Sequence, residues 1–189
     1  MRVLGISGSL RRDSHNTALL RHVGELFEAE GAEFEIYHWL RDIPPYDEDE
    51  DVQPAPEAVA RIRAAVAEAD AVFFSTPEYN HSIPGVLKNA IDWLSRPVAT
   101  NVLRGKPVAA IGASTGMFGA VWAQAELRKV LGATGARVVE GEVPVAHAHT
   151  RFGDDGRLSD VDTEAQVREV IRSLLVELEP AGEPAELAA

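Results

Sequence analysis

The sequence predicts a three-layer α/β fold, in which helices cover both faces of a doubly wound sheet of five parallel strands. Apolar stretches of strand length alternate five times with longer segments of helical periodicity, which is the order that such a sheet requires. The stretches 71–74 and 108–111 are apolar without interruption, as is typical of parallel strands buried on both faces. Loops of small and polar residues follow the first, third and fourth strands, at the edge where parallel sheets bind ligands.

Composition limits the classes of function. The 189 residues suit one domain, which we place at 1–179, with a disordered tail at 180–189 because little of it can be buried. The chain has 30 acidic and 18 basic residues and a formal charge of -12, which disfavours nucleic acids and anionic membranes as partners. No apolar segment is long enough for membrane insertion. The absence of cysteine excludes disulfides and thiolate catalysis, and we expect a cytoplasmic protein.

The first loop joins an apolar strand at 3–6 to a helix at about 16–30, which Gly31 ends. A helix N-terminus presents unpaired N–H groups and a partial positive charge, so it binds anions such as phosphate. Gly8 allows the backbone to approach a ligand closely. The candidate phosphate ligands are Ser9, Arg11, Ser14, Asn16 and Thr17. An ordinary helix cap is the alternative, because the segment matches neither the P-loop nor the dinucleotide-binding pattern.

A second strand is expected at 34–37, followed by a proline-containing loop and the acidic run 47–51. The acidic run lacks the spacing and the central glycine of a calcium-binding loop, so we interpret it as a solvated loop. Pro54 and Pro56 then introduce a helix. Its apolar face is formed by Val59, Ile62 and Val66.

A polar loop, 75–85, follows the third strand. We expect Pro84 in the first turn of the next helix, with Ser82 or Ile83 as its cap, and the helix stops before Pro97.

The fourth strand ends in the loop 112–119, and a helix of about 120–131 follows, closed by Gly132. A fifth strand is expected at 136–139. The last helix is predicted from the apolar positions Val167, Val170, Ile171, Leu174 and Leu178. A flavodoxin-like strand order, 2-1-3-4-5, would bring the loops after strands one, three and four together at the topological switch point.

Three motifs in these loops resemble those of the NAD(P)H-dependent FMN reductases, a family that includes flavin, quinone and chromate reductases. The first motif is Gly8-Ser9-Leu10-Arg11-x-x-Ser14-x-Asn16. The second is Pro77-Glu78-Tyr79-Asn80-x-Ser82-x-Pro84-Gly85-x-Leu87-Lys88-Asn89-Ala90-Ile91-Asp92-Trp93, and the third is Ser114-x-Gly116-x-x-Gly119. The resemblance covers most of the chain, and the long second motif is its most specific part.

The resemblance implies that the first loop holds the phosphate of FMN through Ser9, Arg11, Ser14 and Asn16, with Thr17 beside them. It also implies that the isoalloxazine ring lies between the other two loops. On one side of the ring would be Pro77, Glu78, Tyr79 and Asn80, and on the other Ser114, Thr115, Gly116, Phe118 and Gly119. NADPH or NADH would be the electron donor. Since the flavin carries the chemistry, we expect no catalytic side chain and no metal.

Relatives commonly form dimers or tetramers, so the resemblance also implies a homodimer or homotetramer, with the acidic loop near a neighbour's flavin. Many relatives have Gly-Gly-x-Arg where this chain has Gly119-Ala120-Val121-Trp122. Burial in the core is the favoured interpretation of Trp122, and contact with a partner subunit is the alternative.

Several other side chains invite a chemical role that we weigh against a structural one. We expect Glu78 to act through its backbone, His81 to be an exposed loop residue and Trp93 to pack in the core. His147 and His149 would lie on one face of a strand, but a zinc site needs a third ligand that the spacing does not supply.

The sequence thus predicts an oxidoreductase that passes hydride from NAD(P)H to bound FMN and on to a quinone, flavin or similar small-molecule acceptor, in a ping-pong cycle. A flavodoxin-type electron carrier without its own NAD(P)H turnover is the first alternative, because the acidic charge suits docking to a basic partner. A phosphate-ligand binder without flavin is the second. Nothing in the sequence distinguishes NADPH from NADH or identifies the acceptor.

Overall fold

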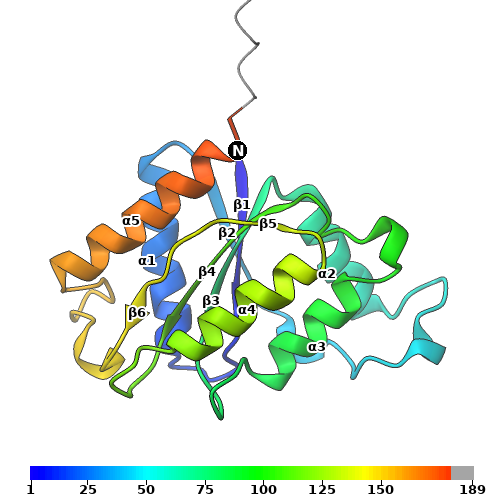
Figure 1. The fold of residues 1–189 in the computed structure, drawn as a ribbon, viewed down its shortest axis with the longest axis horizontal. Helices are drawn as coiled ribbons and strands as arrows, with labels where there is room; N and C mark the ends of the chain where they lie inside the picture. Colours follow the sequence, from blue (N-terminus) through cyan, green and yellow to red (C-terminus); the bar gives the residue numbers. More distant parts are fainter. Residues whose placement is uncertain (180–189) are drawn as a thin grey trace, which may run out of the picture.

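The computed structural model describes residues 1–179, and it has the predicted three layers (Figure 1). The prediction of a tail at 180–189 lies outside the described residues. Five strands form a parallel sheet in the order β2-β1-β3-β4-β5, which confirms the order 2-1-3-4-5. Their bounds are β1 Arg2–Ser7, β2 Glu33–Tyr37, β3 Ala71–Thr76, β4 Pro107–Ala113 and β5 Arg137–Val138.

The helices divide between the two faces of the sheet. Helices α1 (His15–Ala29) and α5 (Val161–Val176) lie on one face, and α2 (Glu57–Glu68), α3 (Gly85–Leu94) and α4 (Val121–Ala133) lie on the other (Figure 1). A separate apolar core fills each space between a helical layer and the sheet. Successive side chains of a strand point to opposite faces, so each buried strand must be apolar on both sides.

The strand β3 shows why the continuous apolar runs belong at the centre of the sheet. Ala71 and Phe73 pack in the core under α1 and α5, whereas Val72 and Phe74 pack in the core under α2, α3 and α4. All six residues of β3 are buried. The edge strand β2 instead alternates between exposed and covered residues.

The C-terminal third departs most from the prediction. The fifth strand is only the two residues Arg137–Val138, and the chain then adds a short strand, β6 (Pro144–Val145), which pairs with β4. The segment predicted to carry two histidines on a strand face is a 3-10 turn, Ala148–Thr150, and His147 precedes it with a φ of 50°. The prediction was wrong there because the irregular segment 139–143 breaks the strand pattern between β5 and β6.

Two helix ends also differ from the prediction. Helix α3 begins at Gly85, so Pro84 is the residue before the helix rather than part of its first turn. Helix α4 continues through Gly132 and ends at Ala133, and the turn glycine after it is Gly135, with a φ of 86°. Glycine ends a helix where the backbone becomes left-handed, and Gly132 does not take that conformation. Within residues 1–179, no helix has the length and apolar character needed to cross a bilayer.

Candidate functional site

The loops after β1, β3 and β4 meet at the carboxyl edge of the sheet, the lower edge in Figure 1. Between them is a cavity of about 220 Å³, which we call the three-loop cavity. Its lining residues are Ser9, Arg11, Ser14, His15, Asn16, Pro77, Glu78, Tyr79, Ala113, Ser114 and Thr115. Nine of the fourteen candidate site residues are in this set. The candidates outside it are Thr17, Asn80, Gly116, Phe118 and Gly119, and the additions are His15 and Ala113.

The first loop passes close to the end of β3 before it enters α1. The N–H of Gly8 donates to the carbonyl of Ser75 at 2.8 Å. A Cβ on Gly8 would lie 3.0 Å from Leu87 Cδ2 and 3.1 Å from Thr76 Oγ1. The absence of a side chain at Gly8 therefore allows the loop to lie directly against β3, and this places the start of α1 at the cavity.

The N-terminus of α1 offers the donors expected of an anion site. Ser14 is its N-cap, and its Oγ accepts from the N–H of Thr17 at 3.3 Å. The N–H groups of His15 and Asn16 have no partner among residues 1–179, as is usual in a first helical turn. Thr17 itself donates through Oγ1 to Ser7 at 3.0 Å, away from the three-loop cavity. Its role in the site is to hold the loop and the cap together.

Asn16 ties the three loops to one another. Its side chain is buried, and its Oδ1 accepts from the N–H of Ala113 and from Ser75 Oγ, both at 2.9 Å. Its Nδ2 donates to the carbonyl of Ala113 at 2.9 Å. Since Ser75 is in β3 and Ala113 ends β4, a single amide connects α1 with both neighbouring strand ends. The side-chain oxygen is fully used by these bonds, and the backbone N–H of Asn16 stays without a partner among residues 1–179.

The charge around the first loop is positive. His15 is partly buried beside Arg11, and the pKa of its imidazole is lowered by burial first, and then by the charges of Arg11 and His149. An anion in the cavity would oppose the second effect, because it stabilises the imidazolium form. Sequence reasoning missed His15, although its position between two candidate ligands, Ser14 and Asn16, is the signal that points to it.

The second loop is a tight turn that presents Tyr79 and His81 to solvent. The backbones of Tyr79 and Ser82 bond each other in both directions, at 3.0 and 3.1 Å. The two central residues, Asn80 and His81, have φ values of 55° and 59°, which is the geometry of a type I′ turn. His81 is exposed, in agreement with the expectation from the sequence.

Glu78 connects the second loop to α4 through its carboxylate. Its Oε2 accepts from the N–H groups of Trp122 and Ala123, at 3.2 and 3.3 Å. The residue before α4, Ala120, has a φ of 64° and supplies no side-chain cap. A carboxylate at a helix N-terminus satisfies unpaired donors and interacts favourably with the helix dipole. We expected the backbone of Glu78 to matter more than its carboxylate, and the structure adds a role for that carboxylate, because it caps a helix from another segment.

An exposed group of aromatic side chains, which we call the aromatic shelf, includes one residue of the cavity lining, Tyr79. It consists of Tyr79, His81, Phe118 and Trp122. The ring of Trp122 lies 4.8 Å from that of Phe118 and 4.6 Å from that of His81, edge to face in both cases. Tyr79 and Phe118 are each 53% exposed and Trp122 is 40% exposed. The favoured interpretation of Trp122 as a core residue was wrong, whereas Trp93 is fully buried as expected.

The backbone of the third loop is held in place by β6 and the turn that follows it. Ser114 donates its N–H to Val145 and accepts through its carbonyl from Ala148, both at 3.0 Å. Gly119 has a φ of 57°, and a Cβ there would lie 2.4 Å from the carbonyl carbon of Pro144. The extra strand β6 thus serves the site, because it fixes the backbone of the loop from Ser114 to Gly119.

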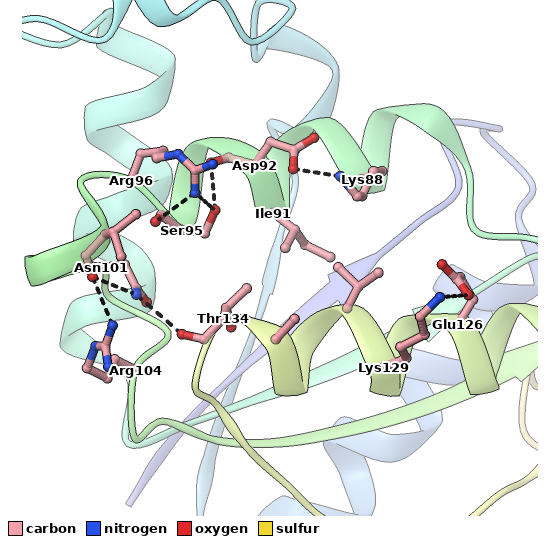
Figure 2. Close-up of a pocket in the computed structure, with 13 residues that line it drawn as sticks. Lys88, Ile91, Asp92, Ser95, Arg96, Asn101, Arg104, Glu126, Lys129 and Thr134 are labelled. Atoms are coloured by element: carbon pink, nitrogen blue, oxygen red, sulfur yellow. Dashed lines mark hydrogen bonds and ion pairs between the residues drawn. The ribbon is translucent and has the colours of Figure 1, made fainter.

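A larger cavity lies elsewhere, between α3 and α4, with a volume of about 370 Å³. Figure 2 shows that its charged side chains already have partners: Lys88 pairs with Asp92 at 2.7 Å and Lys129 with Glu126 at 3.4 Å. Arg96 bonds Ser95, and Asn101 bonds the carbonyl of Thr134. A groove whose polar groups are mutually satisfied has few donors left for a cofactor, so the three-loop cavity is the stronger candidate.

Metal chemistry has no support in the described part of the chain. Residues 1–179 contain no cluster of three or more histidine, aspartate or glutamate side chains arranged to hold a metal ion. The rings of His147 and His149 are 6.3 Å apart between centroids, and they are nearly perpendicular.

Comparison with known proteins adds an independent line of evidence. The family model described as NADPH-dependent FMN reductase matches residues 1–150. The chain is similar to the NAD(P)H-dependent FMN reductase PA1204 of Pseudomonas aeruginosa, with 41% identity over 175 residues, covering 92% of this chain and 93% of that protein. It is also similar to a 2-hydroxy-1,4-benzoquinone reductase of a Burkholderia species, with 36% identity over 86% of this chain and 88% of that one.

Solved structures agree with these sequence matches. The flavoenzyme FerB of Paracoccus denitrificans, an NAD(P)H:(acceptor) oxidoreductase, superposes with a TM-score of 0.83. It shares 37% identity, and the match covers 94% of this chain and 96% of that one. A flavodoxin of Pseudomonas aeruginosa superposes with a TM-score of 0.58 at 18% identity, over 93% of this chain and 99% of that one, which supports the flavodoxin-like fold alone.

Proposed function

Since the chain belongs to the NADPH-dependent FMN reductase family, and is therefore an oxidoreductase with FMN as cofactor and NAD(P)H as electron donor, we propose that FMN binds in the three-loop cavity. We propose further that electrons pass from there to a quinone, a flavin or a similar small acceptor. The observation that carries this proposal is the convergence of an anion-binding helix N-terminus with two further loops around one cavity.

The donors of the first loop fit the phosphate of FMN. Arg11 offers a charged fork and Ser9 and Ser14 offer hydroxyl groups. The free N–H groups of His15 and Asn16 complete the set. A phosphate there carries negative charge to the positive end of α1, and the neighbouring His15 gains a partner for its imidazolium form. Thr17 contributes through the cap of α1 rather than through a direct contact.

The other two loops would bracket the ring of the cofactor. Pro77, Glu78 and Tyr79 line one side of the cavity, and Ser114 and Thr115 line the other. We propose that Asn80, Gly116, Phe118 and Gly119, in the same two loops, flank the ring beyond the cavity. When bound, FMN would supply the redox chemistry that couples oxidation of NAD(P)H to reduction of an acceptor. Backbone groups of the two loops would position the ring. The capping contact of Glu78 fixes the position of the second loop relative to α4.

The aromatic shelf is the surface that we assign to planar substrates. Tyr79, which lines the cavity, exposes its ring to solvent, as do Phe118 and Trp122. Aromatic rings stack favourably on flat conjugated molecules. One open surface would serve the nicotinamide first and the acceptor second, so we propose a ping-pong cycle. No side chain of the site is required as an acid or a base for this cycle.

The proposal is tested by the visible spectrum of the purified protein, recorded before and after anaerobic addition of NADPH. We expect yellow protein that loses its flavin absorbance with NADPH and regains it when a quinone is added. Yellow protein that neither NADPH nor NADH reduces would contradict the enzyme assignment and favour an electron carrier, which the net charge of -12 would suit. Protein that fails to bind added FMN would contradict the assignment of the three-loop cavity.

We also propose that the chain forms a homodimer or a homotetramer and acts in the cytoplasm. The support is the resemblance of its motifs to a family of oligomeric enzymes, together with exposed apolar side chains at Val98, Met117 and Trp122. Light scattering coupled to gel filtration measures the mass directly, and a monomeric mass at micromolar concentration would contradict the oligomer.

A further inference from the structure

A second cavity lies behind the first loop, on its far side from the three-loop cavity. Its volume is about 210 Å³. The ends of β1 and β2 and the first turns of α1 form its walls, with Ser9 and Arg11 lining both cavities. Four arginines line it, namely Arg11, Arg12, Arg21 and Arg41, and His38 lies beside them. We call it the arginine cavity.

These four arginines lack the carboxylate partner that nine of the eleven other arginines in residues 1–179 have. The two exceptions, Arg96 and Arg104, donate to neutral oxygens in the cavity between α3 and α4. Within residues 1–179, nine arginines form ion pairs with a carboxylate. None of the four arginines of the cavity is among them. Arg41 donates to the carbonyl of Leu10 at 2.9 Å, but that oxygen is neutral. In a chain with a formal charge of -12, carboxylates are abundant, so four unpaired guanidinium groups around one hollow indicate an anion as the missing partner.

The phosphate of FMN already has a sufficient set of donors on the other side of the loop. The N-terminus of α1 faces the three-loop cavity, where Ser14, His15 and Asn16 lie. Of the four arginines, only Arg11 reaches that cavity. Arg12, Arg21 and Arg41 are therefore available for a second anionic group, adjacent to the first.

We propose that the arginine cavity binds a second phosphomonoester, the 2′-phosphate on the adenosine ribose of NADPH, and so gives the enzyme a preference for NADPH over NADH. This inference rests on the proposed function, because it extends the donor site next to the flavin site. A phosphomonoester carries close to two negative charges at neutral pH and three acceptor oxygens, which match several guanidinium forks. The hydroxyl groups of Ser7 and Thr17 and the ring of His38 add polar lining on the same side.

The test uses FMN-loaded protein and two nucleotides that differ by one phosphate, 2′,5′-ADP and 5′-AMP. Calorimetric titration should show tighter binding of 2′,5′-ADP, by roughly tenfold or more, since charge-assisted hydrogen bonds are the strong ones. In the double variant Arg21→Gln/Arg41→Gln that advantage should disappear. In the matched control Arg168→Gln/Arg172→Gln, which removes the same two positive charges from the exposed face of α5, it should persist.

Kinetics of the same variants complete the test. The double variant should raise the KM for NADPH by roughly tenfold and leave the KM for NADH unchanged. Equal binding of 2′,5′-ADP and 5′-AMP to the wild-type protein would overturn the inference, and so would equal KM values for NADPH and NADH in an active enzyme. Either of these results would leave the proposed function intact.

Two further outcomes would show that the arginine cavity binds a phosphate other than the 2′-phosphate of NADPH. If the double variant loses bound flavin, the arginines serve the FMN cofactor and the inference fails. If it loses free FMN but not riboflavin as an electron acceptor, the cavity binds the phosphate of an acceptor and the assignment to NADPH is wrong. A protein that discriminates 2′,5′-ADP from 5′-AMP but oxidises neither NADPH nor NADH would refute the proposed function, while the arginine cavity would stand as a phosphate site.

Discussion

Single residues at the carboxyl edge of the sheet have more than one role. Asn16 stands in a phosphate-binding motif, yet its side chain joins α1 to the ends of β3 and β4. Glu78 stands in the flavin-facing motif, and its carboxylate caps α4. In both cases a residue of the site also builds the site, because polar groups buried at the meeting point of three loops must be satisfied by the loops themselves.

Replacement of Asn16 should therefore be costly for stability. In Asn16→Ala, the N–H and carbonyl of Ala113 and the hydroxyl of Ser75 lose their partner. We expect the free energy of unfolding to fall by about 3 kcal/mol, since each buried unsatisfied group costs about 1–3 kcal/mol. Urea denaturation of the FMN-free protein measures it. The exposed substitution Gln166→Ala on α5 is the control, with an expected change within about 0.5 kcal/mol, and a loss of that size in Asn16→Ala as well would refute the structural role.

The buried side chain of His22 gives the protein a pH dependence. The ring lies between α1 and α5, and neither nitrogen has a hydrogen-bond partner among residues 1–179. Burial lowers the pKa of His22, opposed by Glu164 and Glu25 and reinforced by Arg168 and Arg157. The unfolded chain therefore binds a proton more readily than the folded chain, so stability is complete above about pH 6.5 and is lost as the pH falls below that value.

His22→Gln should make the urea midpoint less sensitive to acid when measured at pH 8, 6 and 5. Some sensitivity should remain, because the pKa of His15 is lowered in the same direction. The exposed substitution His38→Gln should leave the acid sensitivity unchanged. An equal loss of stability on acidification in wild type and His22→Gln would contradict the assignment.

At the scale of elements, short irregular segments position the loops of the site. The left-handed residues Gly119 and Ala120 turn the chain from the third loop into α4, and β6, which joins the sheet by pairing with β4, supports that loop. A Cβ added at Gly119 would clash with Pro144, whereas a Cβ added at Gly132, in the last turn of α4, would meet nothing within 4 Å. We therefore expect alanine substitutions at these two glycines to change the stability in opposite directions.

Gly119→Ala should destabilise the protein by at least about 2 kcal/mol, because it combines a left-handed backbone with a clash. Gly132→Ala should stabilise it by up to about 1 kcal/mol, since alanine favours the helical backbone more than glycine does. Thermal unfolding of the two variants, each compared with wild type, provides the measurement. A stabilised Gly119→Ala would mean that the contact of the third loop with β6 is absent in solution.

At the scale of the whole molecule, stability and ligand binding are linked through the three-loop cavity. A ligand that binds only the folded state raises its stability in proportion to the logarithm of the ligand concentration. FMN at 100 times its dissociation constant should add about 2.7 kcal/mol. Riboflavin at the same concentration should add clearly less, because it lacks the phosphate that the N-terminus of α1 would bind. Equal stabilisation by the two compounds would show that the first loop does not bind phosphate.

The sequence by itself determined the parts of this protein that depend on local pattern. Alternating apolar and helical segments were sufficient for the order of β1, α1, β2, α2 and β3 along the chain. The flavodoxin-like strand order, which would bring the three loops together, was confirmed. Nine of the candidate site residues line one cavity. Four of them, Ser9, Arg11, Ser14 and Asn16, were predicted from the loop before the first helix, and the other five from the resemblance of the motifs to a known family. These features follow from neighbours in the chain, since periodicity and turn residues act over a few positions.

The tertiary structure alone decided which distant residues meet. Four features depend on how segments from different elements lie against one another. They are the exposure of Trp122, the cap that Glu78 supplies to α4, the strand β6 and the arginine cavity. No periodicity or motif records such contacts, because they arise from the packing of helices against the sheet. For the same reason the sequence did not distinguish NADPH from NADH. The arginines of the arginine cavity predict a preference for NADPH.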